Sequence, residues 1–493
     1  MFSRSSGILL HISSLPGKYG IGSIGKEAFK FADFLSDAKQ SLWQILPLCP
    51  IGSENCPYIG LSAFAGNFLF IDIDYLVSDG LLMKSDTKGF HFSDSFVDYS
   101  QVRIHKTRLL KKAYSNFINK KNSFQSEYEK FCASNVSWLD DYSLFMALTD
   151  QNNNLPWYKW QKELKFRDKS TLKKVVKNFG HEIGFNKFLQ FIFFRQWFAL
   201  KKYVNEKGIK IIGDNPIYLS YGSCDVWANP ELFLLDEELN PLKVSGVPPD
   251  YFSPNGQLWG HSLYNWKAHK KTNFFWWLKN IKATLNLVDI LRIDHFIGFV
   301  NYWAVPFGSE TAIKGNWVKA PGNDLFKYLK KELGDIPIIA EDLGNKSERV
   351  DKLMKRMNFP GMKLLQEGIN GGSNHPFAPH NFDSVNSVVY TSTHDSNTVK
   401  GWFDRLDPSN KKTVLQNLGC DEKNIVKEMI RQAWSSVAVF SIAQMQDILG
   451  LGSEARMNTP GTVLNNWQWR MKENYSSKTI IDWFSKITKQ YNR

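Results

Sequence analysis

The sequence predicts an α/β fold, a (β/α)8 TIM barrel, for the 493-residue chain. Three observations lead to this prediction. The chain opens with a strand, helix, strand pattern, strand candidates alternate with helical segments along most of its length, and four of the strand candidates end in an acidic residue. Parallel strands joined by helices form such barrels, and polar side chains gather at the carboxyl ends of their strands.

The first elements form one βαβ unit. Residues 6–13 read as a strand, 15–25 as a glycine-rich turn, 26–38 as an amphipathic helix and 42–48 as a second strand. This order is typical of a parallel sheet, because a helix must carry the chain back to the starting edge.

Two insertions interrupt the barrel pattern. Apolar residues at helical spacing fill residues 75–206, which predicts a mainly helical subdomain between strands 2 and 3. The third strand is expected at 209–213. Residues 217–275 hold clustered Gly, Pro, Asn and Asp, which predicts a loop-rich subdomain between strands 3 and 4, at the carboxyl rim. The barrel with its insertions is expected to span residues 1–493.

The second half supplies the remaining strands. Strand candidates lie at 287–294, 336–341, 362–365 and 388–392. A helical run over 422–449 then leads to a last rim segment at 455–462, which we take as the eighth strand candidate.

The strand ends carry the candidate site. Four segments run apolar and then end in an acidic residue: Asp214, Asp294, Glu341 and Asp395. A lone Asp after a strand is as often the N-cap of the next helix. Residues two apart in a strand share a face, so Arg292 accompanies Asp294, and His394 directly precedes Asp395. A cap needs neither companion, so the four together favour a site.

Composition limits the class of protein. No stretch approaches the ~20 uninterrupted apolar residues of a membrane span, and the amino terminus lacks the apolar run of a signal peptide. The five cysteines have no paired spacing, which suits a reducing compartment. We therefore expect a cytoplasmic protein without a membrane partner.

Positive charge is concentrated in one region. Residues 101–210 hold 22 Lys and Arg against 9 Asp and Glu, whereas the rest of the chain is balanced. Such a region can bind nucleic acid. It lacks glycine-rich or aromatic RNA-binding signatures, so a solvated helical surface without a nucleic-acid partner is the favoured interpretation.

Aromatic residues occur in the predicted rim loops. The chain has 17 Trp, 18 Tyr and 36 Phe. Most Phe residues within helices are expected to be core, but Tyr251, Phe252 and Trp259 stand among Gly, Pro, Asn and Gln. Aromatic faces offer apolar contact to the CH-rich faces of sugars, so these three are candidate binding residues.

Carboxylates and aromatics without a metal cluster suit the chemistry of a glycosidic bond. Such chemistry uses one carboxyl group as general acid and base and another as nucleophile. Glu341 follows Ile-Ile-Ala, and an apolar setting raises the pKa of an acid. Arg292 would favour an ionised Asp294 through charge proximity. Glu341 is therefore the expected acid and Asp294 the expected nucleophile, and neither a cofactor nor a metal is expected.

Seven ordered motifs resemble one known family. They are Ser13-Ser-Leu-Pro-Gly17, Cys56-Pro-Tyr58 with Ser62-Ala-Phe-Ala-Gly-Asn67, Gly213-Asp-Asn-Pro-Ile217, Gly246-Val-Pro-Pro-Asp-Tyr-Phe252, Arg292-Ile-Asp-His-Phe296, Ala340-Glu-Asp-Leu-Gly344 and Thr393-His-Asp395. The match continues to Asn458-Thr-Pro-Gly461 and Asn466-Trp467. The chain thus resembles the amylomaltases, the 4-α-glucanotransferases of glycoside hydrolase family 77, over nearly its whole length.

The resemblance implies a retaining transfer on α-1,4-glucans and malto-oligosaccharides through a covalent glucosyl-enzyme. Asp294 would act as the nucleophile and Glu341 as the general acid and base. Asp395 would hold sugar hydroxyls in the transition state. The expected substrate-binding residues are Tyr58, Asp214, Tyr251, Phe252, Trp259, Arg292, His394 and Asn466. The resemblance assigns the segment from Tyr251 to Trp259 to a loop over the acceptor side.

Two alternatives remain open at this point. An α-amylase-like hydrolase would use the same three carboxylates and release sugars into water. A non-catalytic glucan-binding protein would not need all three. Oligomeric state, preferred chain length and the role of the basic region do not follow from the sequence.

Overall fold

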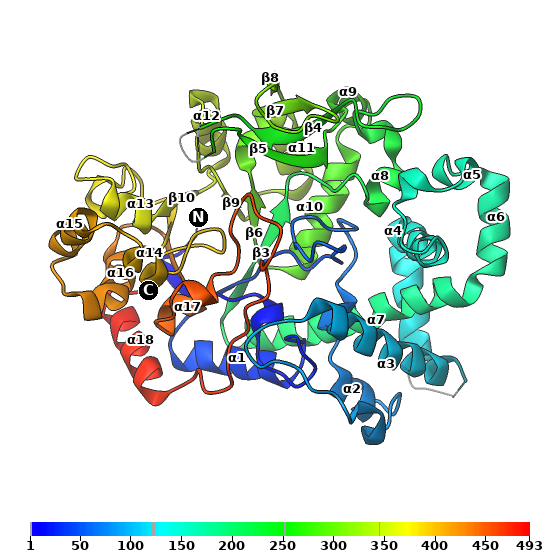
Figure 1. The fold of residues 1–493 in the computed structure, drawn as a ribbon, viewed down its shortest axis with the longest axis horizontal. Helices are drawn as coiled ribbons and strands as arrows, with labels where there is room; N and C mark the ends of the chain where they lie inside the picture. The colour runs from blue at the N-terminus through cyan, green and yellow to red at the C-terminus, as the bar shows by residue number, and fades with distance from the viewer. Residues whose placement is uncertain (1, 120–123, 251–252, 345) are drawn as a thin grey trace.

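A closed barrel of eight parallel strands forms the centre of the computed structural model, which describes residues 2–119, 124–250, 253–344 and 346–493 (Figure 1). Around the barrel the order is β1-β12-β11-β10-β9-β6-β3-β2. The strands are β1 (Ser5–Leu9), β2 (Leu42–Gln44), β3 (Lys210–Pro216), β6 (Ile290–Asp294), β9 (Ile338–Ala340), β10 (Gly361–Leu364), β11 (Ser387–Tyr390) and β12 (Phe440–Gln444). The predicted (β/α)8 fold class is confirmed.

Apolar side chains fill the barrel. Each of the eight strands contributes to one buried cluster, through Leu9, Leu42, Ile212, Ile290, Ile339, Met362, Val388 and Phe440. Their sequence neighbours, such as Ile211 and Leu291, belong to other clusters that pack toward the surrounding helices. Strands buried on both faces read as continuous apolar runs rather than as alternating patterns.

The prediction of the eighth strand at residues 455–462 is wrong. Strand β12 lies inside the predicted helical run 422–449, and residues 455–462 form no barrel strand. Helix α16 (Ile425–Ser435) ends early. Strand β12 then pairs with β1 over Phe440 to Gln444 and with β11 over Phe440 to Ile442. A short apolar run has no periodicity that distinguishes a strand from a buried helix. The prediction therefore extended the helix over the residues that form β12.

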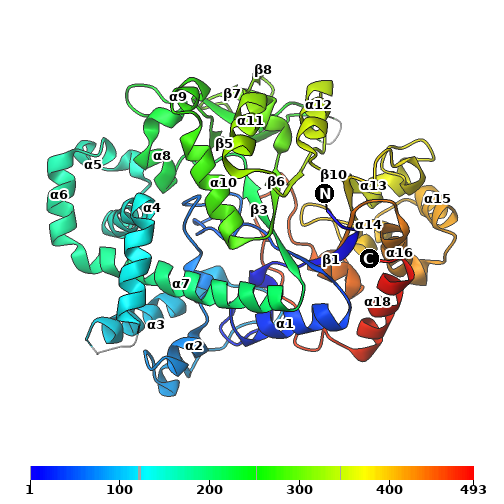
Figure 2. The ribbon, with the colours of Figure 1, turned by 180° about the vertical axis from the view of Figure 1, so that it is seen from behind.

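Among the described residues, six α-helices lie between β2 and β3 and form the lobe on the right of Figure 1. They are α2 (Ile73–Ser78), α3 (Tyr99–Asn119), α4 (Gln125–Gln151), α5 (Lys162–Lys165), α6 (Lys169–Asn178) and α7 (Gly180–Glu206). Helix α7 packs along α4 and leads into β3, as the view from behind shows (Figure 2). The boundaries 75–206 for an inserted subdomain stay a prediction.

A second sheet lies outside the barrel. It is antiparallel, with the order β5-β4-β7-β8, and consists of β4 (Lys243–Val247), β5 (Gln257–Ser262), β7 (Asn301–Pro306) and β8 (Asn316–Lys319). Residues 217–275 thus contain two strands, and β4 pairs with β7 from beyond β6. This pairing joins segments far apart in sequence, and a local pattern does not predict it.

The other helices surround the barrel. The predicted helix 26–38 is α1 (Lys26–Asp37). The rest are α8 (Cys224–Ala228), α9 (Trp266–Lys271), α10 (Phe275–Leu287), α11 (Gly322–Leu333), α12 (Glu348–Met357), α13 (Leu365–Asn370), α14 (Val399–Asp404), α15 (Pro408–Leu418), α16, α17 (Met445–Ile448) and α18 (Lys478–Gln490). In the part of the chain that the structure describes, none of the helices has the length and apolar character needed to cross a bilayer.

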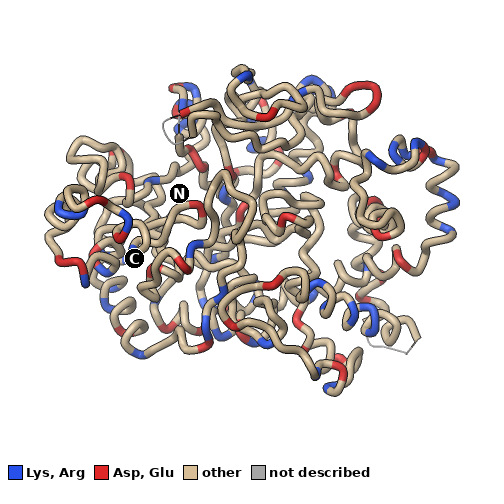
Figure 3. The backbone as a smooth tube through the Cα atoms, viewed as in Figure 1, with Lys and Arg blue, Asp and Glu red and all other residues tan. Residues whose placement is uncertain are grey.

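The described Lys and Arg side chains of the basic region lie mostly at the surface. Figure 3 shows Lys and Arg gathered along α5 and α6, and α6 buries no residue. Lys106 on α3 is the exception, because it is 1% exposed and its Nζ donates to the carbonyls of Leu69 (2.6 Å) and Ile71 (2.8 Å). One lysine of the region therefore ties the helical lobe to the chain that leaves β2.

Candidate active site

The ends of β3 and β6 meet in a buried ion pair. Arg292 Nη1 donates to both carboxylate oxygens of Asp214, at 2.8 and 2.6 Å, and to Asp294 Oδ1 at 3.1 Å. The strand register pairs Asp214 with Arg292 directly. Burial alone would lower the pKa of Arg292, but the two carboxylates outweigh it and raise the pKa well above its usual value. Arg292 is therefore a fixed positive charge beside Asp294.

Tyr58 joins this group from the loop after β2. Its hydroxyl donates to Asp214 Oδ2 at 2.8 Å, and its ring stacks on His394 with 5.2 Å between centroids and 12° between planes. The ring of Trp467 lies 5.7 Å from that of Tyr58 and 6.0 Å from that of His394. Asp214, Tyr58 and His394 thus form one wall together with Trp467, which belongs to a matched motif but was not among the predicted binding residues.

Glu341 lies at the end of β9 beside Asp294. The register pairs Ile293 with Ala340, so the next residues on the two strands, Asp294 and Glu341, are neighbours across strands that run about 4.8 Å apart. Glu341 is 8% exposed, and its oxygens accept from the backbone N–H of His295 (2.8 Å) and Leu343 (2.7 Å).

The environment of Glu341 favours its protonated form. Burial raises its pKa to about 8, and the nearby charge of Asp294 adds to this, while Arg292 and the two N–H donors oppose it. The predicted apolar setting is therefore present. A carboxyl group with a pKa near 8 can hold a proton at neutral pH and release it during a reaction.

His295 takes a backbone conformation that is rare outside glycine. Its φ and ψ are 47° and 49°, in the left-handed region, directly after Asp294. This turn aims the N–H of His295 at the Glu341 carboxylate, while the next N–H, of Phe296, donates to the Glu341 carbonyl at 2.9 Å. Such strain is found where the surrounding structure fixes a site, and here it links the two carboxylates.

Asp395 is held from the last rim segment. Asn458 Nδ2 donates to Asp395 Oδ1 at 2.6 Å, His394 Nε2 lies 3.1 Å from Oδ2, and Arg456 donates to the Asp395 carbonyl at 2.8 Å. Burial would raise the pKa of Asp395, but His394, Asn458 and Arg292 outweigh it and hold the pKa well below its usual value. Asp395 is therefore an ionised carboxylate.

The three aspartates of the site differ in the exposed fraction of their side chains. The side chains of Asp294 and Asp395 are 26% and 45% exposed, whereas that of Asp214 is fully buried against Arg292. Asp294 and Asp395 are therefore open to a ligand, and Asp214 is not. Asp214 serves this arrangement by fixing Arg292 and Tyr58.

Trp259 on β5 lies beside His295, the residue that follows Asp294. Its ring meets that of His295 edge-on, with centroids 4.7 Å apart, and its Nε1 donates to Gln257 Oε1 at 3.2 Å. The side chain is half-buried. Tyr251 and Phe252 lie outside the described residues.

The side chain of Asn466 forms hydrogen bonds within its own loop. It accepts from the N–H of Thr459 (3.0 Å) and donates to the carbonyl of Thr462 (2.9 Å). These bonds shape the turn before Trp467. Asn458 and Arg456 make the contacts with Asp395. Asn458 begins one of the matched motifs, but neither residue was among the predicted site residues.

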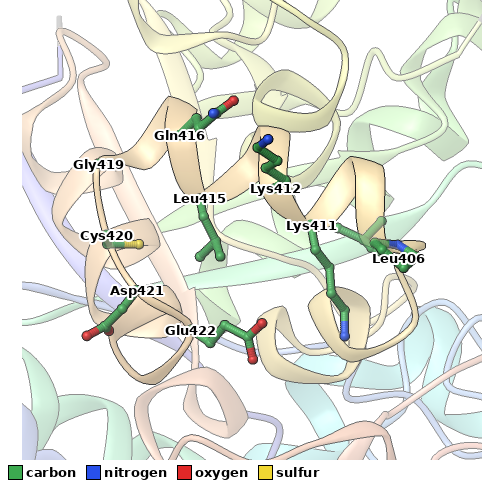
Figure 4. Close-up of a pocket in the computed structure, with 10 residues that line it drawn as sticks. Leu406, Lys411, Lys412, Leu415, Gln416, Gly419, Cys420, Asp421 and Glu422 are labelled. Atoms are coloured by element: carbon green, nitrogen blue, oxygen red, sulfur yellow. The ribbon is translucent and has the colours of Figure 1, made fainter.

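Two further questions concern possible metal ligands and hollows away from this arrangement. Among the described residues, no group of three or more His, Cys, Asp or Glu could hold a metal ion. Figure 4 shows a surface hollow of about 610 Å³ between α15 and the turn at Asp421 and Glu422, lined also by Lys411 and Lys412. None of the described site residues lines it.

Comparison with known proteins shows which family the chain resembles. A 4-alpha-glucanotransferase family model, glycoside hydrolase family 77, matches residues 10–476. The 4-alpha-glucanotransferase of Clostridium butyricum is 47% identical over 98% of this chain and 100% of its own length, and that of Synechocystis is 46% identical over 99% and 98%.

Solved structures agree as well. The amylomaltase of Streptococcus agalactiae, solved in complex with acarbose, is 39% identical and superposes with a TM-score of 0.96 over 99% of both chains. The amylomaltase of Corynebacterium glutamicum, at 15% identity and a TM-score of 0.79 over 99% of this chain and 75% of its own, shares the fold. The resemblance seen in the motifs is thereby confirmed, and the chain belongs to the 4-alpha-glucanotransferase family, glycoside hydrolase family 77.

Proposed function

We propose that the protein is a 4-α-glucanotransferase that moves a segment of α-1,4-glucan to the 4-hydroxyl of an acceptor glucose or oligosaccharide. The observation that carries the proposal is the register of β6 and β9. It puts Asp294, beside the fixed charge of Arg292, next to Glu341, which is buried and has a raised pKa. Two adjacent carboxyl groups, one of which can hold a proton near neutral pH, are what a retaining glycosyl transfer requires.

In the first step, a carboxylate oxygen of Asp294 attacks the anomeric carbon. The bond from that carbon to the glycosidic oxygen breaks, and Glu341 gives its proton to the departing oxygen. The product is a glucosyl ester on Asp294 and a shortened glucan with a free 4-hydroxyl. Glu341 is then a carboxylate, stabilised by the N–H groups of His295 and Leu343.

In the second step, Glu341 takes the proton from the 4-hydroxyl of an acceptor sugar. The acceptor oxygen attacks the anomeric carbon, the ester bond to Asp294 breaks, and both carboxyl groups return to their starting states. Two inversions give net retention. The mechanism needs no cofactor and no metal.

Asp395 is proposed to bind hydroxyls of the sugar at the reacting carbon and to stabilise the charge that develops there. Its ionised form and its exposure support this role. The proposed wall of the same subsite comprises Tyr58, Asp214, Arg292 and His394. Trp259, Tyr251 and Phe252 are proposed on the acceptor side, and Asn466 as a further substrate-binding residue. We expect acarbose to bind the same subsite.

Product analysis tests the proposal. Maltotriose incubated with the purified protein should yield glucose together with maltopentaose and longer chains, while the number of reducing ends stays constant. An α-amylase-like hydrolase would instead raise the number of reducing ends and form no longer chains. A non-catalytic glucan-binding protein would leave maltotriose unchanged.

A further inference from the structure

A buried carboxylate outside the candidate site holds both ends of the loop that carries Asp395. Asp447, on α17, is 1% exposed. Its Oδ2 accepts from the hydroxyl of Thr391 at 2.7 Å and from that of Ser392, and its Oδ1 accepts from the N–H of Val399 at 2.7 Å. Thr391 follows β11, and Val399 is the first residue of α14.

The loop between these two anchors needs such support. Its backbone leaves the barrel at Thr391, whose N–H makes the last bond to β12 through the carbonyl of Ile442. From Ser392 to Thr398 no sheet or helix ladder holds the chain. His394 and Asp395 lie in the middle of this stretch, where Asn458 and Arg456 bind them from the last rim segment. Asp447 fixes the two ends of the same stretch.

Asp447 is the acceptor in all three of these hydrogen bonds. Gln444 Nε2 donates to the hydroxyl of Ser392, which in turn donates to Asp447. Burial raises the pKa of Asp447 to about 6, which leaves it ionised at neutral pH. A carboxylate offers only acceptors, which fits three donors. An asparagine would present an N–H₂ group to one side, and a donor would then face a donor.

We propose that Asp447 is a positioning residue for glucan transfer, which fixes the loop 391–399 so that Asp395 and His394 meet the sugar in the transition state. This inference rests on the proposed role of Asp395. It names no new contact with substrate. It predicts that loosening Asp447 weakens transition-state binding more than ground-state binding, because the loop acts on the developing charge.

The test compares Asp447→Asn with wild type by two measurements on the same folded samples. These are kcat/KM for maltotriose disproportionation and the inhibition constant for acarbose, whose flattened unsaturated ring and protonated bridging amine imitate the transition state. We expect kcat/KM to fall about 30-fold and acarbose affinity to fall at least tenfold, with KM for maltotriose changed less than threefold.

Asp72→Asn is the matched control. Asp72 is also a buried carboxylate, 6% exposed, which accepts from Ser23 Oγ (2.7 Å) and caps α2 through the N–H of Tyr75 (3.1 Å). A loss of folded protein lowers the active fraction but leaves the inhibition constant unchanged. We therefore expect Asp72→Asn to bind acarbose like wild type. Equal weakening of acarbose in both variants would overturn the inference.

A milder variant covers the case in which Asp447→Asn does not fold. Ser392→Ala removes one of the three donors, and we expect a three- to tenfold loss in kcat/KM with a parallel loss in acarbose affinity. Values within twofold of wild type for either variant would overturn the inference. Asp395→Asn separates the two proposals, because a fully active Asp395→Asn would contradict the role of Asp395 itself.

Discussion

The backbone N–H of His295 donates to the carboxylate of Glu341 across 2.8 Å, and so links the end of β6 to the end of β9. The bond exists because His295 adopts a left-handed conformation immediately after Asp294. One strained residue thereby fixes the proposed acid relative to the proposed nucleophile. A hydrogen bond to the carboxylate favours its ionised form, which opposes the burial that raises the pKa of Glu341 to about 8.

The raised pKa of Glu341 predicts the alkaline limb of the pH profile. The acid must be protonated to release the leaving sugar, so kcat/KM for maltotriose should fall as pH rises through about 8. An α-maltosyl fluoride donor needs little protonation of its leaving group. The rate at which this donor forms the maltosyl ester on Asp294 should therefore stay nearly constant between pH 7 and 9.

The Glu341→Gln variant gives the matching control. It should lose most activity on maltotriose, by about a thousandfold, and retain far more of the wild-type rate of ester formation from the fluoride. If both donors lose activity equally, or if both show the same alkaline limb in wild type, Glu341 is not the acid.

Asp294→Asn should abolish transfer without loss of the fold. The amide cannot form the ester, so kcat should fall about a thousandfold or more, on the order of 4 kcal/mol in the activation barrier. Arg292 keeps its two bonds to Asp214, so the melting temperature should change by only a few degrees.

Asp289→Asn is the control for Asp294→Asn, because Asp289 immediately precedes β6 and its carboxylate accepts from the N–H of Ile211 at 2.8 Å. We expect this change to lower the melting temperature and to leave kcat close to wild type. Substantial activity in purified Asp294→Asn would remove Asp294 from the mechanism.

The strand ends were predictable from the sequence because a buried parallel strand must change from apolar to polar where it leaves the barrel. Ile290 to Asp294 and Ile338 to Glu341 show this change within a few residues. Since all eight strands point the same way, their polar ends meet at one rim. The gathering of Arg292, Asp294 and Glu341 follows from that rule alone.

The supporting contacts were not predictable, because they join residues far apart in sequence. Asn458 lies 63 residues from Asp395, and Asp447 lies 48 residues from Val399. Their side-chain types are common in loops and caps. The β4–β7 pairing and the eighth strand were missed for a related reason, since short apolar segments become strands only through partners that local patterns do not reveal.

Trp259→Ala should impair the use of acceptors more than the fold. The Trp259 ring is half-buried beside His295, so its removal takes away a face on which an acceptor sugar can stack. We expect KM for a glucose acceptor to rise about tenfold, on the order of 1.4 kcal/mol, in initial-rate assays with a fixed donor. Trp317→Ala, at the opposite edge of the same sheet, is the control. A large fall in melting temperature for Trp259→Ala alone would make Trp259 a core residue.

The lowered pKa of Lys106 predicts how the free energy of unfolding depends on pH. Burial lowers its pKa to about 7, below the ordinary value of 10.5. Between these values the unfolded chain binds a proton that the folded chain lacks, so the contribution of Lys106 to the free energy of unfolding rises with pH. The slope is at most about 1.4 kcal/mol per pH unit. We expect the difference in unfolding free energy between wild type and Lys106→Met to grow in favour of wild type from pH 7 to 9.

The difference between the two proteins is the quantity to measure, because groups other than Lys106 titrate in both and cancel. Urea unfolding at several pH values gives it, and Lys112→Met on the same helix shows the effect of removing an exposed ammonium. A difference that stays constant from pH 7 to 9 would mean that Lys106 remains protonated in the folded protein. Its bonds to the carbonyls of Leu69 and Ile71 would then hold a buried positive charge, stabilised by two acceptors at 2.6 and 2.8 Å.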